Sequence, residues 1–437
     1  MGAIEIGLLS VAAMLVLIYA GMHVSIVLLL VSFVGVWMIT GRFEVAANLL
    51  GLAAADSIAG YTFGVVPLFI FMGLLVGVAD MGRDAFEVAN QLFRRIRGGL
   101  GIATVAANAV FAAITGISIA AAAVFTKIAV PEMLRLGYRP RFAVGVVAGS
   151  SVLGMLIPPS LLLIVYGIIS EQSIGRMFLA GILPGILLAT AFAVCIVIMA
   201  YVFPNYVGGT RTAATRPSDY LGPWAMSLKL GPIVLLVVVV LGGIYGGVFT
   251  ATEAAAVGAL GALILALAKR RLTLGKFWTV LTETGQVTVA ILFLIIAASI
   301  YSRMLALAGV PGAIESAIAG FGLGFYGFLF LYIAVLILLG TVLDAVSILL
   351  IAVPLALPII AGHDVSLIWF GIVSVIAVEI GLLTPPLGLS VYVIKSSLDD
   401  PSITLGDVFY GAFPFAVIML LTLMLIVAFP GLSLFFV

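Results

Sequence analysis

Apolar stretches separated by short polar segments follow one another along almost the whole chain. A helix needs about 20 apolar residues to cross the roughly 30 Å hydrocarbon core of a bilayer. Stretches suited to a single crossing occupy residues 4–20, 24–39, 62–79, 178–203, 231–249, 252–268, 287–307 and 408–429. The pattern predicts an all-α polytopic membrane protein.

Proline pairs interrupt two further crossings. One pair, at 158–159, lies within 142–169, and the other, at 385–386, lies within 369–395. Because proline lacks a backbone N–H and clashes with the preceding turn, each of these crossings is predicted to be a broken helix. Together with the uninterrupted stretches they bring the expectation to about ten crossing helices.

Two other stretches, 98–133 and 325–360, are too long for one crossing. As single helices rising about 1.5 Å per residue, each would extend past roughly 50 Å. Each is therefore predicted to fold back on itself as a re-entrant helical hairpin.

The composition agrees with a chain that is solvated largely by lipid. Hydrophobic residues make up 64% of the chain, charged residues 8%, and the mean hydropathy is +1.38. The net charge of +1 comes without a long basic tract, so the bilayer is an expected partner and nucleic acid is not. A single cysteine, Cys195, excludes disulfides within the chain and thiolate metal clusters. The sequence also lacks nucleotide-binding and hydrolase motifs, so neither an enzyme nor a bound cofactor is predicted.

Lysine and arginine favour cytoplasmic loops and so indicate the orientation. With the cluster at 94–97 placed inside, the predicted crossings bring most other basic residues inside as well: Arg135, Arg139, Arg141, Arg211, Arg216, Lys229, Lys269, Arg270, Arg271, Lys276 and Lys395. The loops that flank the second hairpin, 309–324 and 361–366, contain no basic residue and fall outside. Arg42 and Arg176 are exceptions in exterior loops. Both termini are expected on the periplasmic side.

Short motifs recur at a nearly constant spacing of about 227 residues. The motif at 18–21 corresponds to 244–247, 154–159 corresponds to 381–386, and 181–184 corresponds to 411–414. The chain is thus divided into a first repeat (1–203), a cytoplasmic linker (204–228) and a second repeat (229–437). Each repeat has an odd number of crossings, which turns the second copy upside down. Inverted repeats of this kind are typical of secondary transporters.

The bends of the hairpins and the proline breaks are the expected places for binding chemistry. Irregular backbone in a membrane must be buried in protein or line a cavity. Its free carbonyl groups can ligate a hard cation, and helix N-termini suit a carboxylate. The first bend is expected near 115–118 and the second near 340–344.

Ionisable residues within apolar stretches are costly in lipid and indicate function. Asp344, at the second bend, is assigned an ion-related role, although a structural pairing or a protonated carboxyl would also explain it. Glu379, just before the second break, has the same two interpretations. Glu253 fits a helix cap, and Lys127 and Arg303 are assigned structural roles.

Hydroxyl side chains stand at the bends and just ahead of the breaks. Ser150, Ser151 and Thr384 precede the proline pairs. They either ligate a cation or donate back to a carbonyl of their own helix, and the sequence leaves both interpretations open. Residues 84–97, with apolar side chains among charges, are expected to form an amphipathic interfacial helix.

Several segments resemble the large membrane subunit of TRAP (tripartite ATP-independent periplasmic) transporters. They are 128–133 with Gly137-Tyr138, 156–160, 178–185, 250–257 and 381–388, in the family's order. The resemblance implies the translocating subunit of a sodium-coupled importer of organic acids in the bacterial inner membrane. It also implies two protein partners, a small four-helix membrane subunit and a periplasmic substrate-binding protein. Sodium would serve as the coupling ion, and an elevator mechanism would move the hairpins and broken helices against a scaffold.

The resemblance also implies site residues. One sodium site would lie between the first bend and break, at Thr115, Gly116, Ser118, Ser151, Gly154 and Pro158. The other would lie between the second bend and break, at Gly340, Thr341, Asp344, Gly381, Thr384 and Pro385. The substrate would contact Thr115, Ser118, Pro159, Ser160, Thr341 and Pro386. Many family members have Ser-Gly-Ser where this chain has Thr115-Gly116-Ile117, a departure that weakens the case for side-chain ligation there and leaves the backbone carbonyls available.

Two other functions fit the same pattern. A self-sufficient sodium- or proton-coupled transporter of organic anions would have the same architecture. A non-transporting membrane scaffold subunit would also be helical and apolar, but the short loops offer no extramembrane domain to support that role.

Overall fold

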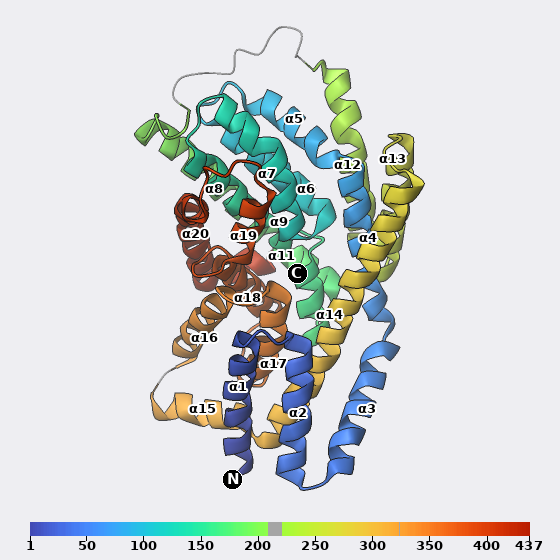
Figure 1. The fold of residues 1–437 in the computed structure, drawn as a ribbon, viewed down its shortest axis with the longest axis vertical. Coiled ribbons are helices and arrows are strands. Elements are labelled where there is room, and N and C mark those ends of the chain that lie inside the picture. Colours follow the sequence, from blue (N-terminus) through green and yellow to red (C-terminus); the bar gives the residue numbers. More distant parts are fainter. Residues whose placement is uncertain (209–220, 323) are drawn as a thin grey trace.

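The computed structural model describes residues 1–208, 221–322 and 324–437, and this part of the chain forms helices joined by turns (Figure 1). The first half contains α1 (Ala3–Tyr19), α2 (Val24–Thr40), α3 (Phe43–Ala59), η1 (Tyr61–Gly64), α4 (Val65–Val78), α5 (Met81–Phe93), α6 (Gly99–Thr115), α7 (Ser118–Arg135), α8 (Pro140–Ser151), α9 (Leu153–Leu156), α10 (Leu161–Ile169) and α11 (Ile174–Val202). The second half contains α12 (Pro223–Tyr245), α13 (Ala251–Ala268), α14 (Leu274–Ala308), α15 (Val310–Gly320), α16 (Phe325–Gly340), α17 (Ala345–Ala361), α18 (Leu367–Leu382), α19 (Leu389–Ser397), α20 (Leu405–Ala428) and α21 (Gly431–Leu434).

The helices confirm a polytopic membrane protein. Among the described residues, 5 helices are long and apolar enough to cross a membrane, or up to 7 if each of two bent pairs counts as one span. Further apolar helices, including α1, α2 and α6, have 10–17 residues. The predicted linker, 204–228, is shorter than expected because α12 begins at Pro223. Its residues 209–220, with Arg211 and Arg216, lie outside the described part.

Both predicted long stretches are divided into two helices. In 98–133 the division falls between α6 and α7, and in 325–360 it falls between α16 and α17. The two members of each pair pack against one another. Both proline pairs also interrupt helices as expected, with α8 and α9 before the first pair, α10 after it, α18 before the second pair and α19 after it.

Four elements differ from the expectation in their presence or their bounds. α3 is a helix that the apolar pattern missed, because Glu44, Asn48 and Asp56 dilute its hydropathy. α14 starts at Leu274, well before the apolar stretch at 287–307, since its first turns present polar residues to the surface. The loop expected at 309–324 contains α15. The amphipathic helix expected at 84–97 is α5, which ends at Phe93.

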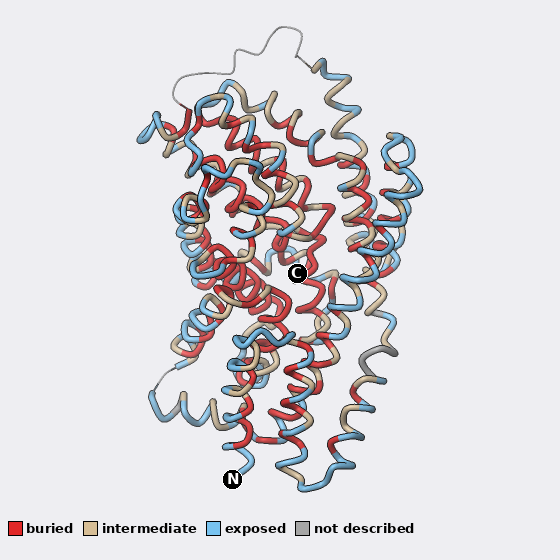
Figure 2. Tube along the Cα trace, in the orientation of Figure 1, coloured by how far each residue is buried: buried red, intermediate tan, exposed pale blue. Residues whose placement is uncertain are grey.

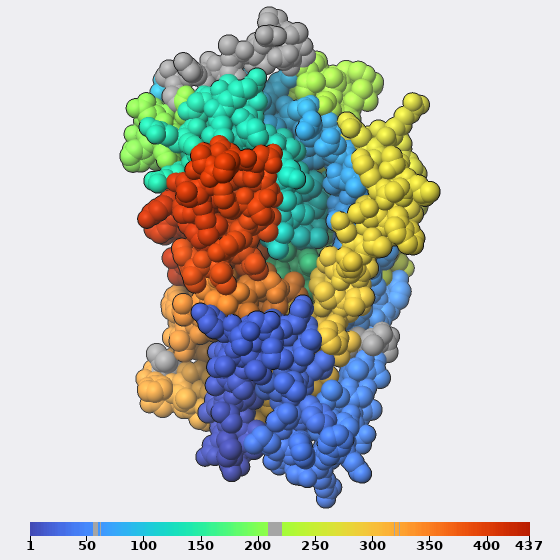
Figure 3. All heavy atoms as spheres, in the orientation of Figure 1, coloured from blue at the N-terminus to red at the C-terminus, as the bar shows by residue number. Residues whose placement is uncertain are grey.

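The helices form two groups that contact each other along one side. We call α1–α4 and α12–α14 the frame helices, and α6–α11 with α16–α20 the central helices. α14 runs along most of the long axis, with α1 and α2 beside its C-terminal part (Figure 1). The N-terminal helices α1 and α2 and the orange-red segment that includes α19 lie on the same face of the molecule (Figure 3). Segments from the two halves are therefore interleaved.

The broken helices lie at the centre of the molecule. Residues 368–382 of α18 are all buried, as are residues 142–151 of α8 (Figure 2). A helix that is apolar on every side is stable only inside a protein or in lipid. The short side chains of α8 allow close contacts with its neighbours, and α20 approaches it so closely that Gly145 and Gly411 face each other's backbone.

Charged side chains gather at the helix ends. Arg141 pairs with Asp407 at 2.7 Å where α8 and α20 begin. Lys229 of α12 pairs with Asp84 at 2.9 Å and with Glu87. Lys269, at the end of α13, also pairs with Asp84. These contacts attach α5 to the frame helices.

Gly411→Ala is expected to destabilise the protein, because the added methyl group would lie 1.9 Å from the Arg141 carbonyl oxygen. Overpacking of this kind costs about 1–3 kcal/mol of folding free energy, so the purified protein in detergent should unfold several degrees lower. Gly406→Ala on the same helix is the matched control, since a methyl group there would meet only Thr404 Oγ1, at 3.6 Å. Equal thermal stability of the two variants would contradict the close contact between α8 and α20.

Candidate cation and solute site

The first bend is built by one left-handed glycine and one extended residue. α6 ends at Thr115, Gly116 has a φ of +62°, and Ile117 is extended with a φ of −133°. A left-handed glycine is a common end to a helix because it carries no Cβ. α7 then begins at Ser118, so its free N–H groups lie beside the carbonyl groups that end α6.

The first bend contacts the first proline break through backbone groups. The N–H of Leu161 donates to the Gly116 carbonyl oxygen at 3.1 Å. A Cβ on Gly116 would lie 2.5 Å from the Pro159 carbonyl oxygen. A Cβ on Gly154 would lie 3.1 Å from the Ser118 nitrogen. Small residues therefore bring the two irregular segments into direct contact.

The second bend is built differently. α16 ends at Gly340, and Asp344 caps α17. The Asp344 carboxylate accepts from the Ser347 N–H at 3.0 Å and also from the Ser347 hydroxyl. An acidic cap satisfies free N–H groups and favours the positive end of the helix dipole. Asp344 thus has a structural role as the cap of α17, and its carboxylate lies at the bend.

The second bend contacts the second break in the same way as the first. The N–H of Leu387 donates to the Thr341 carbonyl oxygen at 3.1 Å, with the N–H of Gly388 at 3.4 Å. A Cβ on Gly340 would lie 2.6 Å from the Gly381 Cα. In both halves, a carbonyl group of the bend accepts from an N–H that follows the proline pair.

Helices that begin at the bend of one half pack against helices that follow the break of the other half. α7, the second helix of the first pair, packs against α19, which follows the second break. α17, the second helix of the other pair, packs against α10, which follows the first break. These contacts connect the two halves of the chain among the central helices.

Most of the candidate hydroxyls donate back to their own helices. Each does so to a carbonyl three or four residues earlier, at 2.7–3.0 Å: Thr115, Ser151, Thr341 and Thr384. Ser160 caps α10, accepting from Leu163 N–H at 3.3 Å. Ser118 is the exception, because its buried hydroxyl has no hydrogen-bond partner among the described residues. The carbonyls and the Ser118 hydroxyl are thus the groups of the first bend left for a ligand.

Two predicted site residues face other partners. The Ser151 hydroxyl donates to the Ala148 carbonyl oxygen within α8 at 2.9 Å. Pro158 lies toward α11, where a Cβ on Gly181 would meet its Cδ at 3.6 Å. Sequence reasoning missed Ser390, whose buried hydroxyl also lacks a partner among the described residues, and Ser347 beside Asp344. No spacing or motif distinguishes these serines from ordinary helix residues.

The two breaks differ in exposure. Pro158 and Pro159 are buried, whereas Pro385 and Pro386 are exposed and Leu387 is 40% exposed. The two bends differ as well. A Cβ on Gly73 of α4 would lie 2.9 Å from the Thr115 carbonyl oxygen, so a frame helix covers the first bend.

The second bend opens onto a cavity of about 510 Å³. Asp344, Ser347 and Leu389 line one side of it, and His23 and Ser25, at the turn between α1 and α2, line another. α14 closes a third side with Ala290, Ile291 and Leu294. The site is thus accessible at the second bend and covered at the first.

The donor groups suit a hard cation. Carbonyl and hydroxyl oxygens and one carboxylate surround the bends, and hard cations prefer oxygen ligands. Among the described residues there is no group of three or more His, Cys, Asp or Glu side chains that could hold a transition metal. Glu379 is 2% exposed, and neither of its oxygens has a partner in the described part of the chain. It is a buried carboxyl just before the second break.

Comparison with known proteins assigns the chain to a family. The model of the tripartite ATP-independent periplasmic transporter, DctM component, matches residues 11–432. The chain is 35% identical over 376 residues to the C4-dicarboxylate TRAP transporter large permease protein DctM of Pseudomonas aeruginosa, covering 86% of each chain. It is 31% identical over 429 residues to the sialic acid TRAP transporter large permease protein SiaM of Vibrio cholerae, covering 97% of each.

A solved structure shares the fold. The chain resembles the crystal structure of the YdaH transporter of Alcanivorax borkumensis with a TM-score of 0.58 and 14% identity, covering 89% of this chain and 90% of the other. The curated relatives are permease subunits of transporters and not enzymes. The chain therefore belongs to the DctM family, the large multi-pass membrane subunit of tripartite ATP-independent periplasmic transporters.

Proposed function

We propose that this chain is the translocating subunit of a sodium-coupled importer of small organic acids in a bacterial inner membrane. The observation that carries the proposal is the matched pair of bend and break contacts, in which Gly116 and Thr341 each present a carbonyl oxygen to the segment after a proline pair. Each contact gathers oxygen ligands and free helix ends within the protein, where a cation and a carboxylate can be held together.

The substrate class comes from the relatives. The relatives from Pseudomonas aeruginosa and Vibrio cholerae are named for C4-dicarboxylate and sialic acid, which are carboxylates. A carboxylate between the bends would face the N-termini of α7 and α17, whose dipoles favour negative charge. We place one sodium ion at each bend, with Asp344 neutralising part of the charge at the second.

The unequal access to the two bends supports alternating access. We propose that the two halves form an inverted repeat and that the central helices slide against the frame helices in an elevator motion. On the charge distribution of the loops, the turn between α1 and α2 faces the cytoplasm. The cavity that joins this turn to Asp344 would then be the cytoplasmic exit, and the first bend would open in the opposite state.

Two protein partners complete the proposed system. Large subunits of this family work with a small membrane subunit and a periplasmic binding protein. Uptake into proteoliposomes that contain all three components should stop when the sodium gradient is removed. Full uptake without sodium would refute the coupling, and full uptake by this chain alone would indicate a self-sufficient transporter.

Asp344→Asn is expected to weaken the sodium dependence of uptake. Asparagine is as good a helix cap as aspartate, so the variant should fold normally while losing the negative charge at the second bend. The sodium concentration that gives half-maximal uptake should rise at least about tenfold, which corresponds to about 1.4 kcal/mol of binding free energy. Lys127→Gln, a charge change at an exposed position of α7, is the control. Similar sodium curves for both variants would remove Asp344 from the proposed site.

Gly116→Ala is expected to abolish most uptake while the protein still inserts into the membrane. Its methyl group would lie 2.5 Å from the Pro159 carbonyl oxygen and push the first bend away from the break. Gly137→Ala is the matched control, since Gly137 also has a positive φ, of +84°, but has open space around it. Both variants should lose about 1–2 kcal/mol of stability from the left-handed backbone. Only Gly116→Ala should also lose transport, and equal transport by the two variants would argue against the contact's role.

A further inference from the structure

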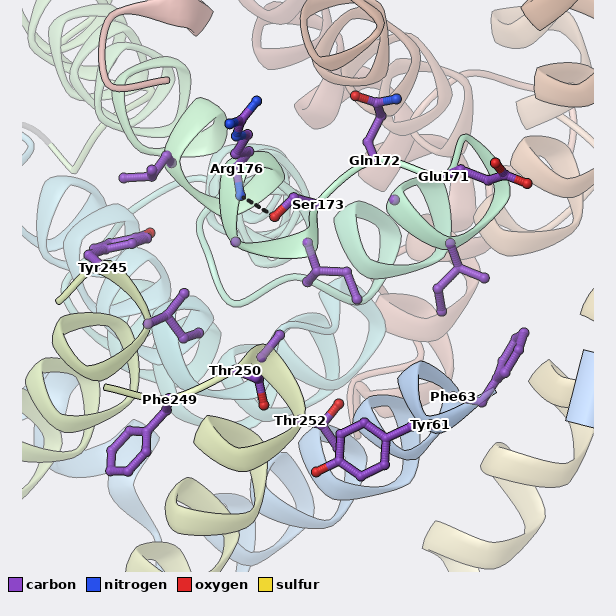
Figure 4. A pocket seen from close by; sticks show the side chains of 17 residues that line it. Tyr61, Phe63, Glu171, Gln172, Ser173, Arg176, Tyr245, Phe249, Thr250 and Thr252 are labelled. Atoms are coloured by element: carbon purple, nitrogen blue, oxygen red, sulfur yellow. Dashed lines mark hydrogen bonds between the residues drawn. The ribbon is translucent and has the colours of Figure 1, made fainter. Parts of the chain in front are cut away.

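Another cavity lies away from the bends, between the frame and central helices. Its volume is about 790 Å³. Three segments line it: the turn from α10 into α11, the turn from α12 into α13, and η1 (Figure 4). In the proposed topology the two turns face the periplasm, the side from which a solute would enter.

Two long helices begin at this cavity. Ser173 caps α11, and Thr250 caps α13. The first residues of both helices line the cavity: Ile174, Gly175, Ala251 and Thr252. Among the described residues, no hydrogen bond uses the backbone N–H of any of these four. Free N–H groups at a helix start, together with the helix dipole, favour an anion.

Side chains add a positive charge and a hydroxyl group to this end of the cavity. Arg176, one of the two arginines that the charge pattern left in an exterior loop, lines the cavity. Tyr245 lines it too, and its buried hydroxyl has no partner within the described part of the chain. In Figure 4 both residues lie toward one side, while Glu171 lies on the other. Opposite Ser173, Tyr61 and Thr252 form the far wall (Figure 4).

Among the described residues that line the cavity, Glu171 is the acidic one, and it lies where this cavity meets a second one. The second cavity, of about 440 Å³, shares Phe63, Ile168 and Glu171 with the first, and Arg303 also lines it. It continues along α14 to the second helix of the second hairpin, where Leu350 and Pro354 line it. The two cavities thus extend from the helix starts at α11 and α13 to the middle and C-terminal part of α17.

We infer that the end of the larger cavity beside Arg176 is an accessory binding site for the carboxylate group of the solute, occupied before the solute reaches the bends. The identity of the solute rests on the proposed function, whereas the site itself rests on the free N–H groups, Arg176 and Tyr245. The same groups would also accept a lipid phosphate, so the test separates the two sources.

The test places a cysteine in the cavity and compares its reaction rates with anionic and cationic thiol reagents, which depend on the local charge. Tyr61, which is 70% exposed, is replaced by cysteine after the natural Cys195 has been changed to serine. The full chain in lipid nanodiscs is then treated with an anionic or a cationic methanethiosulfonate. With Arg176 present, the anionic reagent should be favoured, and Arg176→Gln should lower the anionic-to-cationic rate ratio at least about threefold.

Two further variants show whether the rate ratio responds to charge at the cavity and in which direction. Arg42→Gln removes the other arginine assigned to an exterior loop, which does not line the cavity, and should leave the ratio unchanged. Glu171→Gln should raise the ratio. A ratio that responds equally to Arg176→Gln and Arg42→Gln would overturn the inference.

Protection of the same cysteine identifies the occupant. Millimolar succinate should slow its reaction with a neutral reagent at least about threefold without sodium, and Arg176→Gln should remove the protection. Protection that appears only when phosphatidylglycerol is added to phosphatidylcholine nanodiscs would assign the site to lipid and overturn the inference, as would no protection at all. Because this measurement needs neither sodium nor uptake, it can succeed even where the proposed sodium-coupled transport fails.

Discussion

Backbone groups inside a bilayer have no water to bond, so every interruption of a helix must find its partner within the protein. This chain interrupts its central helices at two bends and two proline pairs, and it satisfies each bend with a break from the same half. Leu161 donates to Gly116, and Leu387 donates to Thr341. Each carbonyl oxygen has a second lone pair, so the contact that holds the segments together also leaves an acceptor for a cation.

The hydrogen bond between bend and break is the same in both halves, but the surroundings of the two bends differ. The first bend is covered by α4 at Gly73, and its proline pair is buried. The second bend faces a cavity, and its proline pair is exposed. A frame helix accounts for the cover over the first bend, since a Cβ on Gly73 would lie 2.9 Å from the Thr115 carbonyl oxygen. In the proposed elevator motion, a shift of the frame helices would change this access and leave the bend and break contacts in place.

The sequence predicted where the irregular segments lie but not how they meet. Helix length located the bends to within a few residues, and proline chemistry located the breaks, since both follow from local geometry. The contact between Gly340 and Gly381 depends on packing across the fold, which hydropathy does not encode. Polar residues hid α3 and the start of α14, because a helix exposed on one side need not be apolar throughout. Ser390 escaped notice because its significance is a missing partner, which appears only in three dimensions.

α5 contacts both the frame helices and the central helices. The relative strength of these contacts decides with which group α5 would move in the proposed elevator motion. Partly exposed ion pairs join it to the frame through Asp84 and Glu87, and such pairs contribute about 0–1 kcal/mol each. Toward the central helices, Phe86 is 5% exposed, and Gly82 packs closely against Phe111 and Val124. Burial of one such aromatic side chain contributes about 1.5–3 kcal/mol. In the proposed motion α5 therefore stays with the central helices, and its ion pairs with Lys229 and Lys269 are the contacts that break.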